Sequence, residues 1–600
     1  MKFIFSYLKK YRYTVAAAML IKSMGAFGEL MLPYVLEHMV DDVVPTKETG
    51  RLVLWGMVMI LLAFAVRQFN VKANRMASRV AKDSTYEIRR DLFWKSLNLS
   101  GSQVDEFGLP SLNSRMTSDS YNLQNFIRGF QVMGVRAPIM LLGGICITLT
   151  MDVGLASILC VLAPIMIVMV VFVSLKGIPL YEKVQQCVDD IVRIMRENIT
   201  GIRVVKALSK EDYETRRFAA ANSQMAGRDI KAGIVTALPG PLLTLVLNIG
   251  LSIVVMLGAV RVNEGVTKPG VILAFLTYFN LILMGVMGVN RIFMLMSKAN
   301  ASAGRIAQVV QARDDLVPVP VSEAAVTERD GYIVFDHVGF NYGGKVEGKA
   351  DGKADGKDGS KNGGTAEGSF DGSGRQKCLD DIDFSMKKGG SLGIIGATGC
   401  GKTTIVNLLM RFYDADEGAV FVDGKDVRTY DKDELHRLFG VVFQNDVIFA
   451  DTLRENISFG RDVGPEDMDA AVADARAREF MGEYEDGYEH KAVVRGANLS
   501  GGQRQRVLIA RALAADPQIL ILGDSSSALD YRTDAALRKA IREHHASATT
   551  IVVAQRISSI MSLDDILVLE EGRIIGHGTH EQLMEGCAVY QEIYKTQMGI

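Results

Sequence analysis

The segment SLGIIGATGCGKTTIVNLL, at residues 391–409, joins residue types that bind phosphate. An apolar run leads into a glycine-rich loop, and a helical pattern follows it. The loop glycines, Gly396, Gly399 and Gly401, allow backbone N–H groups to curl around phosphates at a helix N-terminus. Lys402 can reach the β- and γ-phosphates, and the Thr403 hydroxyl can ligate Mg²⁺. The pattern G-x-x-x-x-G-K-[ST] between a strand and a helix therefore predicts a site for a nucleoside triphosphate.

Three further motifs follow this loop in the chain. Gln444 stands in VVFQND, NLSGGQRQR occupies 498–506, and ILILGDSSSALD occupies 519–530. With these motifs the chain resembles the ATP-binding cassette (ABC) transporters, and among them the exporter-type half-transporters. The resemblance covers nearly all of the 600 residues. It implies ATP and Mg²⁺ as cofactors.

The resemblance also implies roles for individual residues. Tyr342 matches the aromatic residue that stacks on adenine, and Gln444 matches the residue that links the metal site to the membrane domain. Residues 499–503 match the signature, which reaches across a cassette dimer to the ATP held by the other cassette, and 527–530 match the D-loop. The expected nucleotide-binding residues are Tyr342, Gly396, Thr398, Gly399, Cys400, Gly401, Lys402, Thr403, Thr404, Gln444, Ser500, Gly501, Gly502 and Gln503, with Thr403 and Gln444 also at the metal. Segments near 107–119 and 206–215 match the coupling helices that touch the cassettes.

The chain departs from the family pattern at four positions. The pattern is four apolar residues, Asp, Glu, and then residues that end in SALD. Counting back from the Asp of SALD places Gly523 at the Walker B Asp and Asp524 at the catalytic Glu. Gln555 stands at the switch His, and Val494 stands where domain-swapped exporters usually carry a Glu.

These departures weaken hydrolysis. Glycine offers no carboxylate to the Mg²⁺ shell, and Asp524 is one methylene too short to hold a water in line with the γ-phosphate. Gln555 can hydrogen-bond phosphate but cannot carry a positive charge. A group that acts as a general base or positions the attacking water is worth ~10²–10⁴-fold in rate. We therefore expect this P-loop site to bind nucleotide and hydrolyse it very slowly. In an alternative register Asp524 serves the metal and Ser525 stands at the Glu position, with the same consequence.

The signature, by contrast, is intact, and this predicts a partner. A composite site takes its P-loop, Walker B and switch residues from one chain and its signature from the other. A homodimer would hold two impaired sites, whereas a heterodimer keeps one good site, built from a partner's Glu and His and from Ser500–Gln503 of this chain. We therefore expect a second half-transporter as the partner. A nucleotide-sensing regulator that transports nothing and an importer on the same fold are the alternative functions.

The first half of the chain reads as a membrane domain, because a span needs roughly 20 apolar residues. Candidate spans lie at 14–36, 52–70, 134–151, 154–175, 238–260 and 270–296. The two long connections, 67–136 and 176–232, are rich in helix formers and should be membrane helices prolonged into the cytoplasm. The predicted fold class is an all-α six-helix transmembrane domain of the exporter type, at 1–318, followed by an α/β P-loop nucleotide-binding domain, at 319–600. A Gly/Lys/Asp-rich insertion at about 343–376 should be a mobile loop.

Charge sets the orientation and excludes one class of partner. Residues 1–310 carry 34 Lys and Arg against 21 Asp and Glu, a net of +13, and residues 311–600 carry 33 against 48, a net of −15. Both long connections hold 11 Lys and Arg, so they and both termini should be cytoplasmic, in a multi-pass protein of the cell membrane. The near-neutral whole does not indicate a nucleic-acid binder.

The spans contain few groups that could select a substrate. Lys22 and Glu29 lie seven residues apart on one face of the first span. Intramembrane charges indicate function by default, but these two could equally pair with each other or face a water-filled cavity. The expected substrate is hydrophobic or amphipathic, such as a drug, a lipid or a peptide, and membrane lipid surrounds the domain.

Overall fold

A computed structural model describes residues 1–342, 377–524 and 528–599. The predicted insertion at 343–376 lies outside these residues. The chain divides into two compact units: residues 1–98 with 109–312, and residues 99–108 with 313–600. The short segment 99–108 therefore belongs with the second unit, although both of its chain neighbours belong to the first.

The first unit is helical, with six segments in the described residues that are long and apolar enough to cross a membrane, as predicted. Its helices are α1 (Lys2–Leu8), α2 (Arg12–His38), α3 (Thr49–Leu97), α5 (Leu109–Ser114), α6 (Ser120–Pro138), α7 (Gly144–Met151), α8 (Val153–Thr200), α9 (Ile202–Ala207), α10 (Glu211–Ala237), α11 (Pro239–Asn263) and α12 (Pro269–Val310). Short π-helical turns at Arg115–Asp119 and Ile139–Gly143 join α5, α6 and α7 into one continuous helical path.

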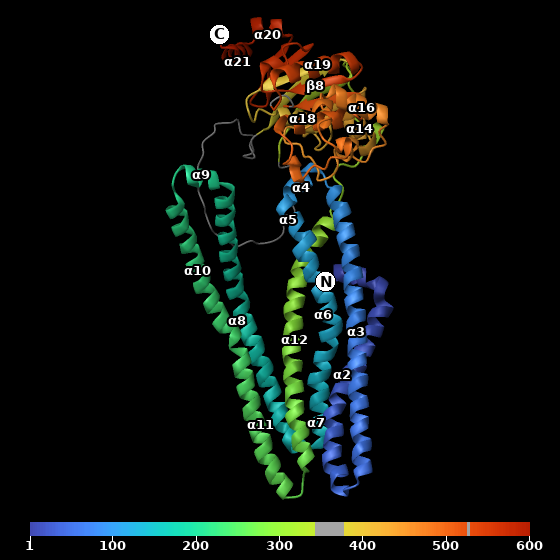
Figure 1. Cartoon of the computed structure of the whole chain (residues 1–600), viewed down its shortest axis with the longest axis vertical. Helices are drawn as coiled ribbons and strands as arrows, with labels where there is room; N and C mark the ends of the chain where they lie inside the picture. Colours follow the sequence, from blue (N-terminus) through green and yellow to red (C-terminus); the bar gives the residue numbers. More distant parts are fainter. Residues whose placement is uncertain (343–376, 525–527, 600) are drawn as a thin grey trace. The chain divides into compact units, whose positions relative to one another are not determined.

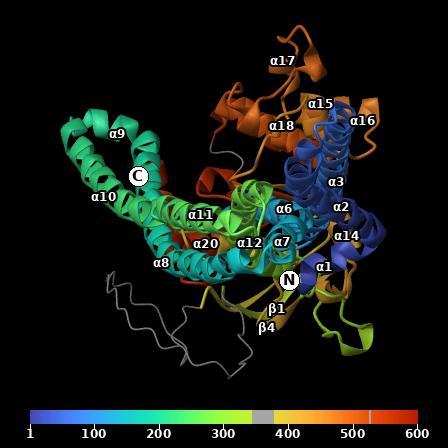
Figure 2. The ribbon, with the colours of Figure 1, turned by 90° about the horizontal axis from the view of Figure 1, so that it is seen from below.

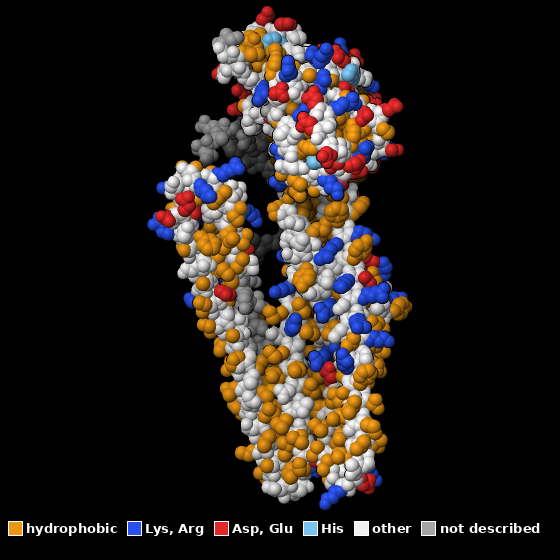
Figure 3. Space-filling view, viewed as in Figure 1, with side chains coloured by type: hydrophobic (Ala, Val, Ile, Leu, Met, Phe, Trp, Pro, Cys, Tyr) orange, Lys and Arg blue, Asp and Glu red, His pale blue; other side chains and the backbone are white. Residues whose placement is uncertain are grey.

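The helices are much longer than a bilayer is thick. α3 has 49 residues and α8 has 48, so at ~1.5 Å per residue each is about 70 Å long, against ~30 Å for the hydrocarbon core. Each therefore continues well beyond the membrane as a helix, as the sequence predicted. Figure 3 agrees: hydrophobic side chains cover the end of this unit that carries the α2–α3 and α11–α12 turns, and Lys and Arg gather farther along.

Two groups of helices make up this unit. α2, α3, α6 and α12 pack against one another, while α8 pairs with α10 and α11. The α8–α10 pair diverges from α12 toward α9, and α8 approaches α7 and α12 at its other end (Figures 1 and 2). Tyr278 of α12 is fully buried in the first group, and its hydroxyl donates to the carbonyl oxygen of Leu30 at 2.7 Å.

The second unit contains two β-sheets and a set of helices. One sheet is antiparallel, in the order β2 (Leu379–Met386), β1 (Ile333–Phe340), β4 (Glu417–Val422) and β5 (Lys425–Asp426). The other has the order β10 (Arg573–Gly578), β9 (Asp565–Glu570), β3 (Ser391–Gly396), β8 (Thr549–Val553), β7 (Ile519–Gly523) and β6 (Phe439–Val442). The helices are α4 (Gly101–Phe107), α13 (Lys402–Leu409), α14 (Lys432–Arg437), α15 (Leu453–Ser458), α16 (Pro465–Asp474), α17 (Arg478–Met481), α18 (Gly501–Leu513), α19 (Tyr531–His544), α20 (His580–Gly586) and α21 (Ala588–Met598).

The strands of the larger sheet run parallel from β9 through β3, β8 and β7 to β6. Its central strands are buried and consist of aliphatic residues, as expected for a parallel sheet covered on both faces. One continuous core packs residues of both sheets around α13, including Phe335, Ile394 and Ile405. This core fixes where the strands end, and those ends carry the candidate site.

Candidate nucleotide site and coupling segment

Four parallel strands end at one edge of the larger sheet, and each is followed by a predicted site residue. The glycine-rich loop follows β3, Gln444 follows β6, Asp524 follows β7, and Gln555 follows β8. Their loops meet at a cavity of about 340 Å³. The cavity is lined by Lys402, Thr403, Val406, Val442, Phe443, Gln444, Asn445, Ile521, Gly523, Asp524, Val553, Ala554 and Gln555.

The glycine-rich loop has the geometry of an anion cradle. Gly399 and Gly401 have φ of 88° and 101°, a region that L side chains rarely adopt. A Cβ on Gly401 would also lie 2.5 Å from the Leu379 side chain. Lys402 begins α13, and its Nζ donates to the carbonyl oxygens of Gly396 and Ala397, both at 2.8 Å. The ammonium group and the free amides at the start of α13 therefore lie together, an arrangement that fits the phosphates of a nucleotide.

The other predicted residues of this loop divide between solvent and core. Thr398 is exposed, and Cys400 and Thr404 are buried. The Thr404 hydroxyl lies 3.1 Å from the Tyr342 hydroxyl and 3.3 Å from Cys378 Sγ. Thr404 therefore stays a predicted binding residue, although its side chain is already in contact with protein.

Tyr342 offers an aromatic surface beside the loop. Its side chain is 45% exposed, and Asn407 Nδ2 of α13 donates to its hydroxyl at 3.2 Å. Phe340 and Tyr413 pack edge-on against its ring, with centroids at 4.9 Å and 5.3 Å. The hydroxyl end is thus fixed to α13 while the ring stays accessible, which suits stacking on a base.

The predicted metal-ligating residues lie at the cavity. Thr403 and Gln444 both line the cavity, and Asp524 is the one carboxylate among its described lining residues. The Asp524 carboxylate is hydrogen-bonded to the Gln444 side chain. These oxygens fit Mg²⁺ in chemical type, but Gly523 adds no ligand. A Cβ on Gly523 would lie 2.9 Å from the Val442 carbonyl oxygen, so a larger residue requires β6 and β7 to separate slightly.

The environment of Asp524 favours the protonated, neutral form of its carboxyl group. Burial raises the pKa of this carboxyl above its usual range, and the positive charges of Arg556 and Lys402 and the Gln444 hydrogen bond offset part of that rise. Its backbone N–H donates to Val553 O at 2.7 Å with φ at 48°, so β8 holds the residue in a left-handed conformation. The carboxylate therefore points into the cavity from a fixed backbone.

The signature lies apart from this cavity in the described residues. Ser500 caps α18, with its hydroxyl accepting from Gln503 N at 3.2 Å and Gln503 Oε1 accepting from Ser500 N at 2.8 Å. Ser500 and Gly501 are exposed and Gly502 is half-buried, yet none of them lines the cavity. They form an exposed helix N-terminus at the start of α18.

Val494 and the predicted D-loop residues are not among the described residues that line the cavity. Val494 is exposed and begins a short 3-10 turn. In the D-loop, Asp530 caps α19 by accepting from Thr533 N at 3.0 Å. Ser527 of the D-loop and Ser525 of the alternative register lie outside the described residues.

The segment 99–108 docks onto the second unit through α4, which the sequence interpretation missed. Ser102 and the cap residue Ser100 donate to the Asp315 carboxylate at 2.9 and 2.6 Å, and Gln103 Nε2 donates to Arg313 O at 2.6 Å. Tyr413 donates to Asp105 Oδ2 at 2.6 Å. The predicted segment, 107–119, is therefore placed several residues too late. The capping-box spacing S-x-x-Q at 100–103 is the signal that could have found it.

Tyr413 connects this segment to the nucleotide site. A Cβ on Gly101 would lie 2.5 Å from its ring, so only glycine allows α4 this close. The same ring packs edge-on against Tyr342 at 5.3 Å. Burial is the larger cause and the hydrogen bond to Asp105 the second cause of a rise in the pKa of Tyr413 above its usual range. The hydroxyl therefore stays protonated and acts as a donor. The contact path from the predicted adenine platform to α4 is thus a single side chain. The second predicted segment, 206–215, stays a prediction.

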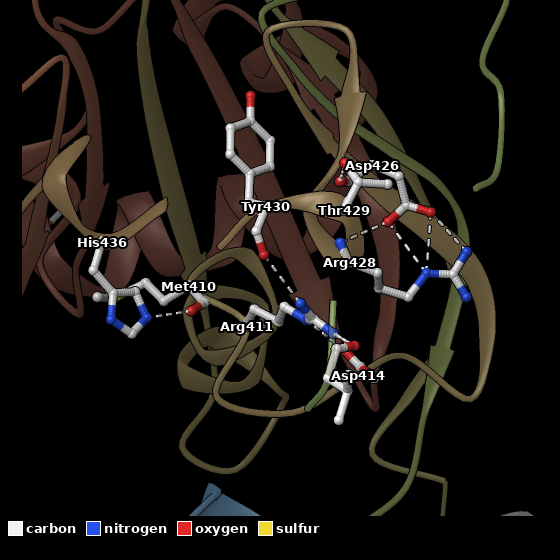
Figure 4. Close-up of polar contacts among 9 residues, drawn as sticks. Met410, Arg411, Asp414, Asp426, Arg428, Thr429, Tyr430 and His436 are labelled. Carbon is white, nitrogen blue, oxygen red and sulfur yellow. Dashed lines mark hydrogen bonds and ion pairs between the residues drawn. The ribbon is translucent and has the colours of Figure 1, made fainter. Parts of the chain in front are cut away.

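A polar network after α13 holds this docking site in place (Figure 4). The buried Arg411 donates to Asp414 at 3.0 Å and to the carbonyl oxygens of Tyr430 and Val317 at 3.4 and 2.9 Å. His436 Nε2 donates to Met410 O at 2.9 Å. Because these bonds flank residues 412 and 413, they fix the backbone that receives α4.

We predict that Tyr413→Phe loosens α4. The change keeps the ring but removes a hydrogen bond to a carboxylate, worth about 1.5–3 kcal/mol. The amides of residues 101–107 should then exchange hydrogen about ten- to hundred-fold faster. Tyr342→Phe is the matched control, because it removes a hydroxyl from the same aromatic cluster without touching α4. Equal exchange rates in the two variants would show that the Asp105 bond does not hold the segment.

We also predict an acid-sensitive contribution from His436. Burial lowers its pKa below the ordinary value of 6.5, so the folded protein favours the neutral ring. The contribution of the neutral ring to the stability of the fold is complete above pH 6.5, and it is lost as the pH falls from 6.5 toward the lowered pKa of the folded protein. Acidification should therefore lower the unfolding temperature of the full chain more than that of His436→Gln, which keeps an N–H donor. Parallel loss in both proteins, measured by scanning calorimetry, would contradict this assignment.

Comparison with known proteins agrees with this architecture. Residues 15–287 match the family model for the ABC transporter transmembrane region, and residues 379–527 match the ABC transporter model. YfiB of Bacillus subtilis (strain 168), an uncharacterized ABC transporter ATP-binding protein, is 32% identical over 600 residues, which cover 99% of this chain and 98% of YfiB. The ATP-dependent lipid A-core flippase of Vibrio vulnificus (strain CMCP6) is 27% identical, over 100% of this chain and 97% of the flippase.

A solved structure shares the fold. It is a bacterial Atm1-family ABC exporter with ATP bound, with a TM-score of 0.76, 23% sequence identity and coverage of 98% of both chains. With YfiB aligned from end to end and both family models matched in order, the chain belongs to the ABC transporter family and is a multi-pass membrane protein that has the exporter fold.

Proposed function

We propose that this chain is one subunit of an ATP-driven exporter and pairs with a second, different half-transporter in the cell membrane. It moves a hydrophobic or amphipathic solute outward. One observation carries the proposal: the cavity that receives the P-loop offers a single carboxylate, Asp524, in its described lining, with Gly523 before it and Gln555 on the next strand loop. That set suits binding a nucleotide better than hydrolysing one.

The residues divide the work of binding. Tyr342 offers its ring to adenine, Lys402 neutralises the phosphates, and the amides at the start of α13 donate to them. Thr403 and Gln444 offer oxygen ligands to Mg²⁺, which when bound supplies further neutralisation of phosphate charge. Asp524 is too short, and Gln555 lacks the charge, to direct a water at the γ-phosphate.

The outward-facing signature supports the pairing. Ser500–Gln503 keep the family's sequence and form an accessible helix N-terminus. A partner that carries a Walker B Glu and a switch His completes one hydrolytic site with them, which two copies of this chain cannot do. Nucleotide binding brings the cassettes together, and α4 passes the movement to α3 and α5, its neighbours in the chain.

We assign residues 1–318 to the transport path and 319–600 to the nucleotide-driven domain, with both termini in the cytoplasm. The Lys and Arg content of the long connections supports this orientation. The flippase relative transports a lipid according to its name, and this supports an amphipathic substrate.

The asymmetry can be tested with paired substitutions in the complex with a co-expressed neighbouring half-transporter. We expect Ser500→Arg to lower the ATP hydrolysis rate of the complex by more than about 100-fold, because the arginine blocks the partner's site. Asp524→Asn should change the rate less than about two-fold, because Asp524 serves a site that contributes little turnover.

The chain alone provides the second arm of this test. It should retain nucleotide binding and show almost no hydrolysis. Vigorous hydrolysis by the chain alone, or equal losses in the two variants, would contradict the proposal. ATP-dependent solute movement in vesicles that bear the pair separates an exporter from a regulator that transports nothing, and the direction of flux separates it from an importer.

A further inference from the structure

A polar cluster lies between α2, α3 and α6 within the transmembrane unit. The Lys22 side chain is 4% exposed, and its Nζ donates to Asn70 Oδ1 at 2.6 Å and Asn74 Oδ1 at 3.3 Å. Asn70 Nδ2 donates to Glu29 Oε1 at 2.9 Å, and Arg136 donates to Glu29 Oε2 at 2.9 Å. Glu29 is thus held by an amide and a guanidinium group, while the partners of Lys22 among the described residues are amide oxygens. The two predicted intramembrane charges are joined through Asn70 rather than paired directly.

A cavity of about 240 Å³ adjoins this cluster and shares Arg136 with it. Its walls come from α6, the following π-helical turn and α12. They consist of Met133, Arg136, Ala137, Met140, Met284, Met287, Gly288 and Arg291. A Cβ on Gly288 would lie 2.7 Å from that of Ala137, so these two small residues allow the helices to approach closely behind the cavity. The four methionines give it an apolar, adaptable lining.

The charges here do not balance. Lys22, Arg136 and Arg291 are cationic, and Glu29 is the one anion in the cluster and the described cavity lining. Arg291 is exposed and has no hydrogen-bond or ion-pair partner among the described residues. Both arginines lie within predicted spans, and Arg136 is compensated by Glu29 whereas Arg291, in the described part of the chain, is not. An intramembrane charge of this kind indicates a functional site by default. The cavity therefore has an excess of positive charge beside an apolar wall.

We propose that this cavity binds an anionic amphiphile, with a phosphate or carboxylate headgroup between Arg136 and Arg291 and an apolar tail along the methionines. The proposal rests on the export function above and narrows its substrate class. Guanidinium groups suit it because they donate two parallel hydrogen bonds to such a headgroup. Glu29 acts as a positioning residue that orients Arg136, and the net positive charge disfavours a cationic amphiphile.

Direct binding tests this without turnover. The full chain in phosphatidylcholine nanodiscs is titrated with dodecyl phosphate, dodecyl maltoside or dodecyltrimethylammonium, which share one tail. Dodecyl phosphate should bind at least about ten-fold more tightly than the others. Arg291→Gln should weaken it about ten- to hundred-fold, because a hydrogen bond to a charged group is lost. Arg128→Gln is the matched control, because Arg128 is exposed on α6 and does not line the cavity.

Charge reversal keeps the test independent of folding. Arg291→Glu should shift the preference from dodecyl phosphate toward dodecyltrimethylammonium, a gain that a misfolded protein cannot produce. Equal affinity for the three probes, or equal loss in Arg291→Gln and Arg128→Gln, would overturn the proposal. Competition by phosphatidylglycerol in the nanodisc would support a membrane lipid as the ligand, and its absence a more water-soluble anion.

The binding assay and the transport assay test the anion site and the export function independently. Selective dodecyl phosphate binding without ATP-driven flux in the paired complex would remove the export function and leave the anion site. ATP-driven flux of neutral amphiphiles, together with no preference for anions in binding, would remove the anion site and leave the export function.

Discussion

The parallel order of β3, β8, β7 and β6 is the constraint on which the nucleotide site depends. Parallel strands bring their carboxyl ends to one edge, so four loops far apart in the chain meet at one cavity. The aliphatic core between the two sheets holds these ends in register. A change of side chain at Asp524 or Gln555 therefore alters the chemistry of the site, while the sheet that positions these residues stays the same. The fold is therefore compatible with a glycine at position 523, at the end of β7.

The same constraint explains why the sequence predicted so much of the site. The P-loop, Gln444, Asp524 and Gln555 each lie within a short motif whose residue types match one chemical task. Their meeting at one cavity follows from the parallel order of β3, β8, β7 and β6. The six spans were equally predictable, because the bilayer requires long apolar helices whose backbone groups are satisfied internally.

Contacts between distant side chains carried no such signal. Tyr413 and Asp105 are 308 positions apart, and neither stands in a motif, so the docking of α4 appeared only in three dimensions. The placement of Gly101 against the Tyr413 ring could not be read from a Ser-Gly-Ser-Gln stretch, although the helix cap could. Arg136 and Arg291 likewise belong to different spans, and only the packing of α6 against α12 brings them to one cavity.

We propose that this chain holds ATP while its partner hydrolyses it. The most direct test photolabels the working pair with 8-azido-ATP carrying radioactivity on the γ-phosphate, with an α-labelled sample as the loading control. The account predicts that this chain keeps the γ-label through many turnovers while the partner retains only the α-label. Equal loss of the γ-label from both chains would contradict it.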